Sequence, residues 1–322
     1  MTPRVDVPSS CLVILNYDGR KMLDEALPSA LGQRCASCEV VVVDNGSTDG
    51  SVEHVRERWP RVRVIPLERN FGVTAALNAM VRAADGAEFV ALLNNDVELD
   101  PHWLVNLVDT MRAHPEAASA AGKLLRHADR GTIDRAGDEL HWSSACFGRG
   151  AGEPDRGQYD VPEEVFSVGG AAALYRTEAF ARVGPFDESF FAYVEDVDWG
   201  LRARLAGYGA RYDPRALGLH HGGATLGHIN QFSLYHLRRN QLWMMLKGYP
   251  ACSLLRHGPA VLLFNLVALA TSGRHMGVVL RAYRDALAGL PRVLGQRRAI
   301  QRARRVGHRE LERVVRPAGR PW

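Results

Sequence analysis

The sequence predicts an α/β fold with a mostly parallel sheet flanked by helices, followed by a basic helical extension. Over the first 120 residues, short apolar segments alternate with helix-like segments, and strands that alternate with helices usually pair in parallel. Each apolar segment is followed by a polar loop. Beyond residue 230 the pattern is helical, and this part carries 17 Lys and Arg against 3 Asp and Glu.

Four apolar segments in the first part have the length and composition of buried strands. Helix-like segments with apolar residues at three- and four-residue spacing follow each of them. The last helix begins after Asp100-Pro101, which is a capping residue followed by a proline suited to the first helical position. The predicted strands are 12–15, 39–43, 63–66 and 89–93, and the predicted helices are 21–31, 51–59, 73–84 and 102–114.

The pattern is weaker in the middle of the chain. Residues 124–164 are rich in glycine and charge, and we expect a mobile loop with a hairpin there. Order returns with a strand at 165–175, helices at 177–183 and 195–206, and a strand at 210–212. A basic amphipathic helix is then predicted from apolar residues at helical spacing, namely Met276, Leu280, Tyr283, Leu287, Leu290 and Leu294.

Length and composition indicate an ordinary folded chain of 322 residues, which we divide into domains 1–229 and 230–322. Hydrophobic residues make up 46% and charged residues 24%, which excludes collagen, a coiled coil and wholesale disorder. The net charge of +4 conceals −10 on the first part and +14 on the second. An acidic body suits metal chemistry, whereas a basic tail suits phosphates, an anionic membrane or nucleic acid.

Cysteine usage and apolar runs predict the compartment. The five cysteines are odd in number and sparse, so we expect a reducing cytoplasm and no role for the pair Cys35 and Cys38. Residues 1–10 lack the apolar core of a signal peptide. The longest apolar run, 258–273, is shorter than the roughly 20 residues that span a bilayer, so no transmembrane helix is predicted.

The loops that follow the four predicted strands hold the polar residues of this part. In a parallel sheet these loops meet at the carboxyl edge, where ligands bind. Asp44 is placed to accept hydrogen bonds from a ligand, and Asn94 with Asp96 offers two oxygen ligands suited to Mg²⁺ or Mn²⁺ on a diphosphate. Taken singly, an Asp after a strand is more often a turn or helix-cap residue. The motifs GxGxxG, GxxxxGK[ST] and GxSxG are absent, which disfavours dehydrogenases, P-loop enzymes and hydrolases.

Three ordered motifs carry a family resemblance. DNGSTDGS, LNNDVELDP and the segment VGGAAALYRTEAFARVGPFDESFFAYVEDVDWGLRARLAGY together resemble the family-two inverting glycosyltransferases with a GT-A fold, and most closely their rhamnosyltransferase-type members. The resemblance covers residues 10–245. It implies transfer of a sugar, for which dTDP-rhamnose is the best single donor, to a hydroxyl of a cell-wall or surface glycan. UDP-galactose, UDP-glucose and a GDP-sugar stay open as donors.

The resemblance also implies roles for residues in the donor pocket. Asp44 would bind the nucleotide base, and Arg69 and Asn70 would lie near the ribose and diphosphate. Gly169 and Gly170 would let the backbone approach a sugar closely. The residues implied to bind the donor are Asn16, Tyr17, Asp44, Arg69, Asn70, Asn94, Asn95 and Gly170.

For catalysis, the resemblance implies that Asp196 is the base, with Glu195 and Gly169 on the acceptor side. Asp96 and His220 would hold Mg²⁺ or Mn²⁺, and His221 is the alternative candidate for the histidine ligand. An inverting transfer needs one base and a neutralised leaving diphosphate, which this set supplies. The alternative for Glu195, Asp196 and Asp198 is a solvated first turn of a helix.

Two rival functions remain open at this point. One is a nucleotidyltransferase, which we expect to have a phosphate-binding loop rich in glycine and basic residues after the first strand. The loop at this place is poor in both. The other is a non-catalytic nucleotide-sugar-binding protein.

The basic tail predicts where the protein acts. We expect a cytoplasmic protein at the inner face of the cytoplasmic membrane, a lipid-linked glycan acceptor and no nucleic acid. The tail would lie in the membrane interface. In the alternative, Phe264, Leu266, Leu269 and Leu280 pack against the body or a second subunit.

Overall fold

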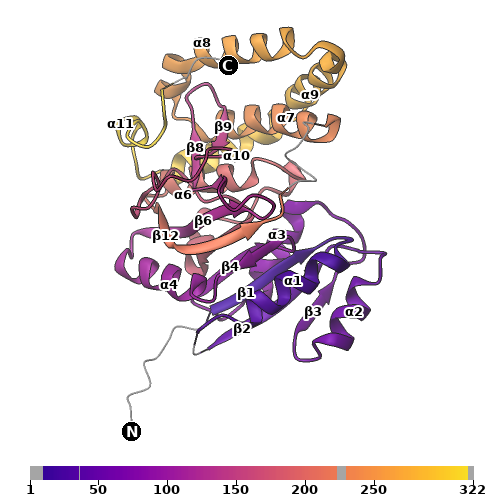
Figure 1. Cartoon of the computed structure of the whole chain (residues 1–322). Helices are drawn as coiled ribbons and strands as arrows, with labels where there is room; N and C mark the ends of the chain where they lie inside the picture. Colours follow the sequence, from indigo (N-terminus) through magenta and orange to yellow (C-terminus); the bar gives the residue numbers. More distant parts are fainter. Residues whose placement is uncertain (1–9, 36, 223–229, 318–322) are drawn as a thin grey trace.

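The computed structural model describes residues 10–35, 37–222 and 230–317. A ten-stranded sheet with helices on both faces forms the body, and a layer of C-terminal helices covers one end of it (Figure 1). The main path through the sheet runs β10-β12-β6-β11-β4-β1-β2-β3. Apart from the antiparallel β11, the central strands are parallel to one another, so the predicted fold class is confirmed.

The first four strands form where the sequence predicts them, as β1 (Ser10–Asn16), β2 (Cys38–Asp44), β3 (Arg63–Pro66) and β4 (Phe89–Asn94). Strand β1 is buried throughout because apolar helices cover both faces of the sheet. In the register of these strands, Asn16 stands opposite Asp44, and Leu15 opposite Asn94. Their polar carboxyl ends therefore lie side by side.

The predicted helices also form, as α1 (Arg20–Leu31), α2 (Ser51–Arg58), α3 (Val73–Ala83) and α4 (Trp103–Ala113). Helix α3 packs on one face of the sheet, and α1 and α4 pack on the other. Two shorter helices follow later in the chain, α5 (Thr177–Val183) and α6 (Glu195–Leu205), with a 3₁₀ turn at Glu188–Phe190 between them.

The second half of the sheet differs from the sequence prediction. The predicted strand 165–175 shortens to β11 (Ala172–Arg176), and the predicted strand 210–212 lengthens to β12 (Gly209–His220). Strand β6 (Ala117–Arg126) was not predicted, because its sequence AASAAGKLLR lacks the β-branched residues that indicate strands. The short β5 (Val97–Leu99) pairs with the end of β12, so that Val97 stands opposite His220.

The predicted loop at 124–164 contains more structure than a hairpin. The hairpin exists, formed by β8 (Asp138–Leu140) and β9 (Cys146–Gly148), while β7 (Ile133–Arg135) pairs with β6 and β10 (Glu163–Glu164) pairs with β12. The buried ammonium of Lys123 also holds the segment, at 3.0 Å from Asp155. A loop prediction for this region is therefore wrong in part, since long-range pairing orders it.

The C-terminal region consists of α7 (Gln231–Gly248), α8 (Ala251–Ala270), α9 (Met276–Ala288), α10 (Leu290–Ala303) and α11 (His308–Leu311), with a 3₁₀ turn at Gly273–His275. Helices α7 and α10 share a hydrophobic cluster with α6, which includes Leu201, Trp243 and Val293. The division into two domains at residue 229 stays a prediction.

The predicted amphipathic helix at 276–294 is broken at Gly289. The ring of Trp243 lies 2.6 Å from where a Cβ of residue 289 would stand, so the close approach requires glycine. The apolar stripe also faces outward, since Met276, Leu280, Leu287 and Leu294 are exposed. The buried faces of α9 and α10 instead consist of Val278, Val279, Ala282, Ala286 and Val293.

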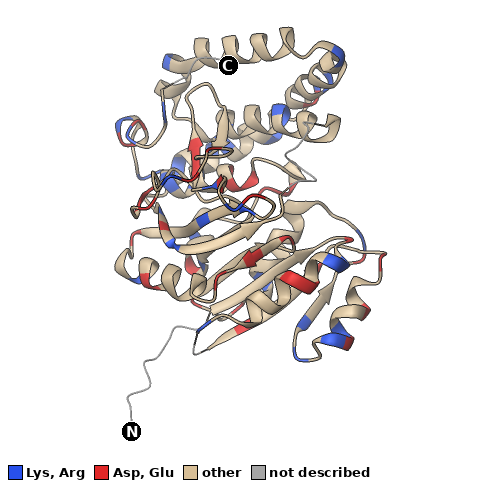
Figure 2. Ribbon diagram, in the orientation of Figure 1, with Lys and Arg blue, Asp and Glu red and all other residues tan. Residues whose placement is uncertain are grey.

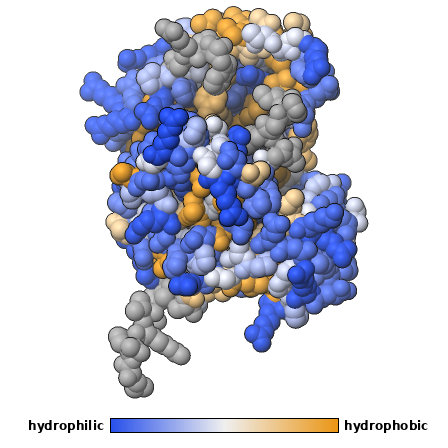
Figure 3. Space-filling view, viewed as in Figure 1, coloured by the Kyte–Doolittle hydropathy of each residue, from blue (hydrophilic) through white to orange (hydrophobic). Residues whose placement is uncertain are grey.

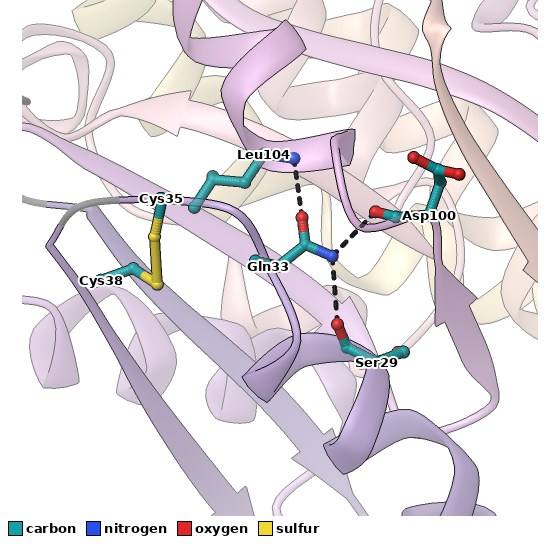
Figure 4. The surroundings of a disulfide bond; sticks show 6 residues. All are labelled: Ser29, Gln33, Cys35, Cys38, Asp100 and Leu104. Atoms are coloured by element: carbon teal, nitrogen blue, oxygen red, sulfur yellow. Dashed lines mark hydrogen bonds between the residues drawn. A yellow bond between two sulfur atoms is a disulfide. The ribbon is translucent and has the colours of Figure 1, made fainter.

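Cys35 and Cys38 form a disulfide between the end of α1 and the start of β2 (Figure 4). Beside it, the Gln33 side chain donates to the carbonyls of Ser29 and Asp100 and accepts from the amide of Leu104. The expectation that this cysteine pair has no role missed the covalent link. The disulfide lies at the amino end of β2, away from the polar loops at the carboxyl edge.

Candidate functional site

Asp44 is the centre of a buried hydrogen-bond cluster at the ends of β1 and β2. Its carboxylate accepts from the Asn16 amide at 2.8 Å, from the Ser47 amide at 2.8 Å and from the Ser47 hydroxyl at 2.6 Å. Asn16 and Asp44 are both almost fully buried. These donors hold the carboxylate in one orientation, as a polar binding pocket requires.

The loops after β2 and β3 are tied to each other. The Asn45 side chain donates to Asn70 Oδ1 at 3.1 Å, and Asn70 Oδ1 also accepts from the amide of Gly72. Gly46 has φ of +81° and passes so close to the backbone of Arg69 that a Cβ would lie 2.4 Å away. Glycine is therefore required where the two loops cross.

The other predicted donor residues lie in the same loops. Tyr17 is half-exposed after β1, whereas Arg69 and Asn70 are exposed after β3. The Asn95 side chain donates to Asn16 Oδ1 at 2.7 Å, which links the loop after β4 to the loop after β1. The backbone of Asn94 donates to the carbonyl of Ala171 on the neighbouring segment.

Asp96 and His220 come together because β5 pairs with β12. His220 Nε2 lies 3.3 Å from Asp96 Oδ1, and His220 Nδ1 lies 2.9 Å from Asp134 Oδ2. His221 turns elsewhere: its Nε2 lies 2.7 Å from Glu25, and its ring stacks on His127. Of the two histidines that the sequence left open, His220 is the one beside Asp96.

This pair fits a hard divalent cation. Asp96 Oδ1 is buried, and the polar atom that faces it is His220 Nε2 at 3.3 Å. Burial by itself would lower the pKa of His220, but Asp134 and Asp96 raise it to about 9. A histidine that binds a metal through one ring nitrogen usually donates its other N–H to a carboxylate, and Asp134 stands in that position at His220 Nδ1.

Asp196 stands in the first turn of α6 and is held by three groups. Its Oδ2 accepts from the Gly170 amide at 2.9 Å, its Oδ1 accepts from the Val197 amide, and the Arg135 guanidinium lies 3.8 Å away. A Cβ on residue 169 would lie 2.3 Å from Arg135 Cδ. Gly169 and Gly170 therefore make room for Arg135 and supply an amide to Asp196.

Two carboxyls near Asp196 have strongly shifted pKa values. Burial raises the pKa of Asp138 to about 7, although Arg135 at 2.6 Å opposes the shift. Burial and the neighbouring Asp196 raise the pKa of Glu195 to about 8. Raised carboxyl pKa values of this kind are typical of acid–base sites.

The sequence analysis missed Asp134, Arg135 and Asp138. They lie in the segment 124–164, whose residue pattern carries no periodic signal. Only the pairing of β7 with β6 shows that they belong to the site.

Burial excludes a solvated first turn for two of the three acidic residues of α6. Glu195 is 8% exposed and Asp198 is fully buried. Asp198 lies 2.9 Å from Arg202 and 3.1 Å from the buried ammonium of Lys247. Asp198 is therefore part of a buried ion-pair network between α6 and α7.

The segment that precedes Glu195 has a strained backbone. Phe191, Tyr193 and Val194 all have φ between +65° and +72°, which is a costly conformation for residues with large or branched side chains. Asn240 on α7 holds the segment, since its side-chain amide lies within hydrogen-bond distance of the carbonyls of Phe190, Ala192 and Tyr193. Strain stored in this way clusters at active sites.

A nearly continuous series of contacts joins these groups. Asp44 bonds Asn16, which bonds Asn95, the neighbour of Asp96. Asp96 contacts His220, and His220 contacts Asp134, whose neighbour Arg135 contacts Asp196. A separate hollow lies at the opposite end of β4, lined by Gly86, Ala87, Glu88, Arg176, Thr177 and Glu178.

Fold and site together define an enzyme of the GT-A type, with polar loops at the carboxyl edge of a mostly parallel sheet. Residues 11–184, just over half of the chain, match the sequence family described as "Glycosyl transferase family 2". The chain therefore belongs to glycosyl transferase family 2.

Curated relatives support this assignment. An N-acetylglucosaminyl-diphospho-decaprenol L-rhamnosyltransferase of Mycobacterium tuberculosis is 32% identical over 246 residues, covering 67% of this chain and 77% of the relative. The succinoglycan biosynthesis protein ExoO of Rhizobium meliloti is 38% identical over 249 residues, covering 76% and 66%.

Solved structures share the fold. A mannosyltransferase from Pyrobaculum calidifontis in complex with GDP-Man and Mn²⁺ aligns with a TM-score of 0.56 at 19% identity, covering 88% of this chain and 76% of that one. GalNAc-T7 with UDP, GalNAc and Mn²⁺ aligns with a TM-score of 0.62 at 14% identity, covering 87% and 55%. The protein is thus a glycosyltransferase that transfers a sugar from a nucleotide-sugar donor to a glycan acceptor.

Proposed function

We propose that this glycosyltransferase transfers rhamnose from dTDP-rhamnose, with inversion, to a hydroxyl of a lipid-linked glycan in the assembly of a cell-wall or surface polysaccharide. The Mycobacterium tuberculosis relative supports both parts, since its name specifies a rhamnosyl group and an acceptor linked to decaprenol by a diphosphate. The single observation that carries the mechanism is the series of contacts that runs from Asp44 through Asp96 to Asp196.

The donor occupies the loops after the first four strands. Asp44, oriented by Asn16 and Ser47, accepts hydrogen bonds from the nucleotide base, and the half-exposed ring of Tyr17 lies against that base. The exposed Arg69 contacts the ribose and diphosphate, because its guanidinium complements their negative charge. Other residues of the loops after β3 and β4 contact the same groups. The remaining donor contacts come from Asn70, Asn94, Asn95 and Gly170.

Asp96 and His220 would hold Mg²⁺ or Mn²⁺. The position of the buried Asp96 Oδ1 opposite His220 Nε2, at 3.3 Å, supports this assignment. When bound, the cation would neutralise the leaving diphosphate. Asp134 acts as a positioning residue, because its carboxylate at His220 Nδ1 directs Nε2 toward Asp96.

Asp196 removes the proton of the acceptor hydroxyl as that oxygen attacks the anomeric carbon. The amides of Gly170 and Val197 and the guanidinium of Arg135 keep its carboxylate in place. Glu195 lies on the acceptor side. With a pKa of about 8, its carboxyl group is protonated at pH 7 and donates a hydrogen bond to the acceptor.

The donor test is thermal stabilisation by dTDP, UDP and GDP and their sugars, with and without Mn²⁺ or Mg²⁺. We expect a metal-dependent shift with dTDP-rhamnose that is lost in Asp96→Ala. A shift with a UDP- or GDP-sugar alone would instead assign a different donor. A shift that persists unchanged in Asp96→Ala would contradict the metal assignment.

The catalytic test compares Asp196→Asn with Asp44→Ala, using dTDP-rhamnose and a lipid-linked N-acetylglucosaminyl diphosphate. We expect Asp196→Asn to reduce transfer by at least about 100-fold, in line with the loss of a general base, while dTDP binding is retained. Asp44→Ala should lose dTDP binding as well. Loss of donor binding in Asp196→Asn would show that Asp196 is a ligand contact rather than the base.

A further inference from the structure

Helix α8 exposes an apolar face along its whole length. Leu255, Leu262, Leu263 and Leu266 are 83%, 61%, 57% and 55% exposed, and their spacing places them on one side of the helix with Pro259. Figure 3 shows this face as a hydrophobic strip along the top of the molecule, where α8 runs. Isolated exposed leucines are common, but an unbroken apolar strip indicates a binding surface.

The opposite face of α8 packs on the protein through the buried Val261 and Ala268 and through several polar groups. The Ser253 hydroxyl lies 2.7 Å from His308 Nδ1, and the His257 ring stacks on Trp142. The backbone carbonyl of Asn265 accepts from the Tyr283 hydroxyl at 3.1 Å. Helix α8 is therefore apolar on both faces, and the protein covers only one of them.

The length of α8 and the charges near it indicate what kind of partner this apolar face binds. Among the described residues, α8 is the one helix long and apolar enough to cross a membrane, and no Asp, Glu, Lys or Arg lies between Arg256 and Arg274. This helix is longer than the apolar run that the sequence analysis considered. Figure 2 shows basic residues at both ends of α8. Residues 251–317 carry 13 Arg against 3 Asp and Glu.

We propose that α8 lies in the plane of an anionic membrane, with Leu255, Leu262, Leu263 and Leu266 among the acyl chains and Arg256 and Arg274 at the phosphates. The cytoplasmic leaflet supplies such a negative surface. A second copy of the chain fits less well, because it would bring like-charged arginines together. A spanning orientation fits less well too, because it would break the contacts of Ser253 and His257 with the protein.

This proposal goes beyond the proposed function and does not rest on it, because it concerns lipid alone. The test is sedimentation of the full-length protein with vesicles of phosphatidylcholine and phosphatidylglycerol in equal parts, without donor or acceptor. The triple variant Leu262→Gln, Leu263→Gln, Leu266→Gln should bind at least tenfold more weakly, because apolar burial drives interfacial binding. The matched control replaces exposed apolar residues elsewhere, as Met22→Gln, Leu31→Gln, Val161→Gln, and should bind like the wild type.

A second variant tests the charge without altering the apolar face. Arg256→Gln, Arg274→Gln should weaken binding to these vesicles severalfold, and pure phosphatidylcholine should bind the wild type more weakly than the mixture.

Four results would each overturn the proposal. Two concern the vesicles: the leucine variant binds as strongly as the wild type, or the wild type binds equally to both vesicle types. The other two are a dimer in the absence of lipid that the leucine substitutions dissociate, and resistance of the bound protein to alkaline carbonate extraction. The last two would indicate a second copy and a spanning helix, respectively.

Discussion

Helices α7 and α8 follow each other in the chain and have similar lengths of 18 and 20 residues, yet α7 buries polar and charged side chains whereas α8 exposes apolar ones. Helix α7 buries Asn240 and Lys247 almost completely against the catalytic body. Helix α8 exposes four leucines. The basic tail thus contains one helix that holds the segment before Glu195 and one that presents an exposed apolar face.

The difference follows from what each helix meets. Helix α7 faces the strained segment before Glu195, whose carbonyls need donors, and the buried acidic residues Asp187 and Asp198, which need a cation. Helix α8 meets the protein along one side only. Helix α7 therefore packs more closely on the body than α8 does.

The largest effect is expected at Lys247. Its ammonium lies 2.5 Å from Asp187 and 3.1 Å from Asp198, and all three side chains are largely buried. Lys247→Met should lower the free energy of unfolding by about 3–5 kcal/mol, since it leaves buried carboxylates without their partner. Urea denaturation measures this loss. The exposed Arg284→Met is the control, and equal stability of the two variants would contradict the role given to α7.

The next effect concerns turnover. Asn240→Ala should reduce the rate of transfer about 100-fold, because the strained segment shifts and misplaces Asp196. Nucleotide binding should change little, because Asn240 contacts the segment 190–193 and not the donor loops. Rates with a soluble acceptor and dTDP titrations separate the two effects. A variant that folds and turns over normally would show that α7 does not position the base.

The pH dependence of stability gives a smaller effect. Burial would raise the pKa of Asp187, but Lys247 and Ser189 lower it to about 2. Because this pKa is lower in the folded state, the stabilisation is complete above pH 3.8 and is lost as pH falls toward 2. We expect a loss of about 2 kcal/mol over that window. Lys247→Met should flatten this part of the stability profile, and an unchanged slope would argue against the ion pair.

The smallest effect is expected on α8. Leu263→Gln should change the free energy of unfolding by less than about 0.5 kcal/mol, because its side chain is already in water in the folded state. Urea denaturation in the absence of lipid measures this. A loss of 2 kcal/mol or more would show that the leucine packs against the protein and that the contrast with α7 is false.

Much of the fold could be predicted because its signals are local. The strands β1 to β4 and the helices between them are marked by apolar runs and periodic spacing. The predicted cap at Asp100 with Pro101 in the first helical position is wrong, because α4 begins at Trp103 with His102 as its N-cap. The sequence analysis missed strand β6 because its alanines give no strand signal. It predicted only part of β12 because this strand has no continuous apolar run. The two strands pair with each other, and β12 also pairs with β5; local sequence does not encode such pairing.

For the site, the sequence placed Asp44, Asn94 and Asp96 at strand ends, and motif resemblance supplied Asp196 and the two histidines. The sequence by itself determined which residues are available for binding and catalysis. This is because chemistry depends on residue type, and because strand ends meet at one edge of a parallel sheet.

The tertiary structure decided which residues meet. It placed the ring of His220, and not that of His221, beside the Asp96 carboxylate, brought Arg135 and Asp138 to Asp196, and turned the leucines of α8 outward. Such contacts depend on strand register and helix packing between segments far apart in the chain. Hydrophobic spacing specifies that a helix has an apolar face, but only packing decides whether that face meets the core or the surroundings.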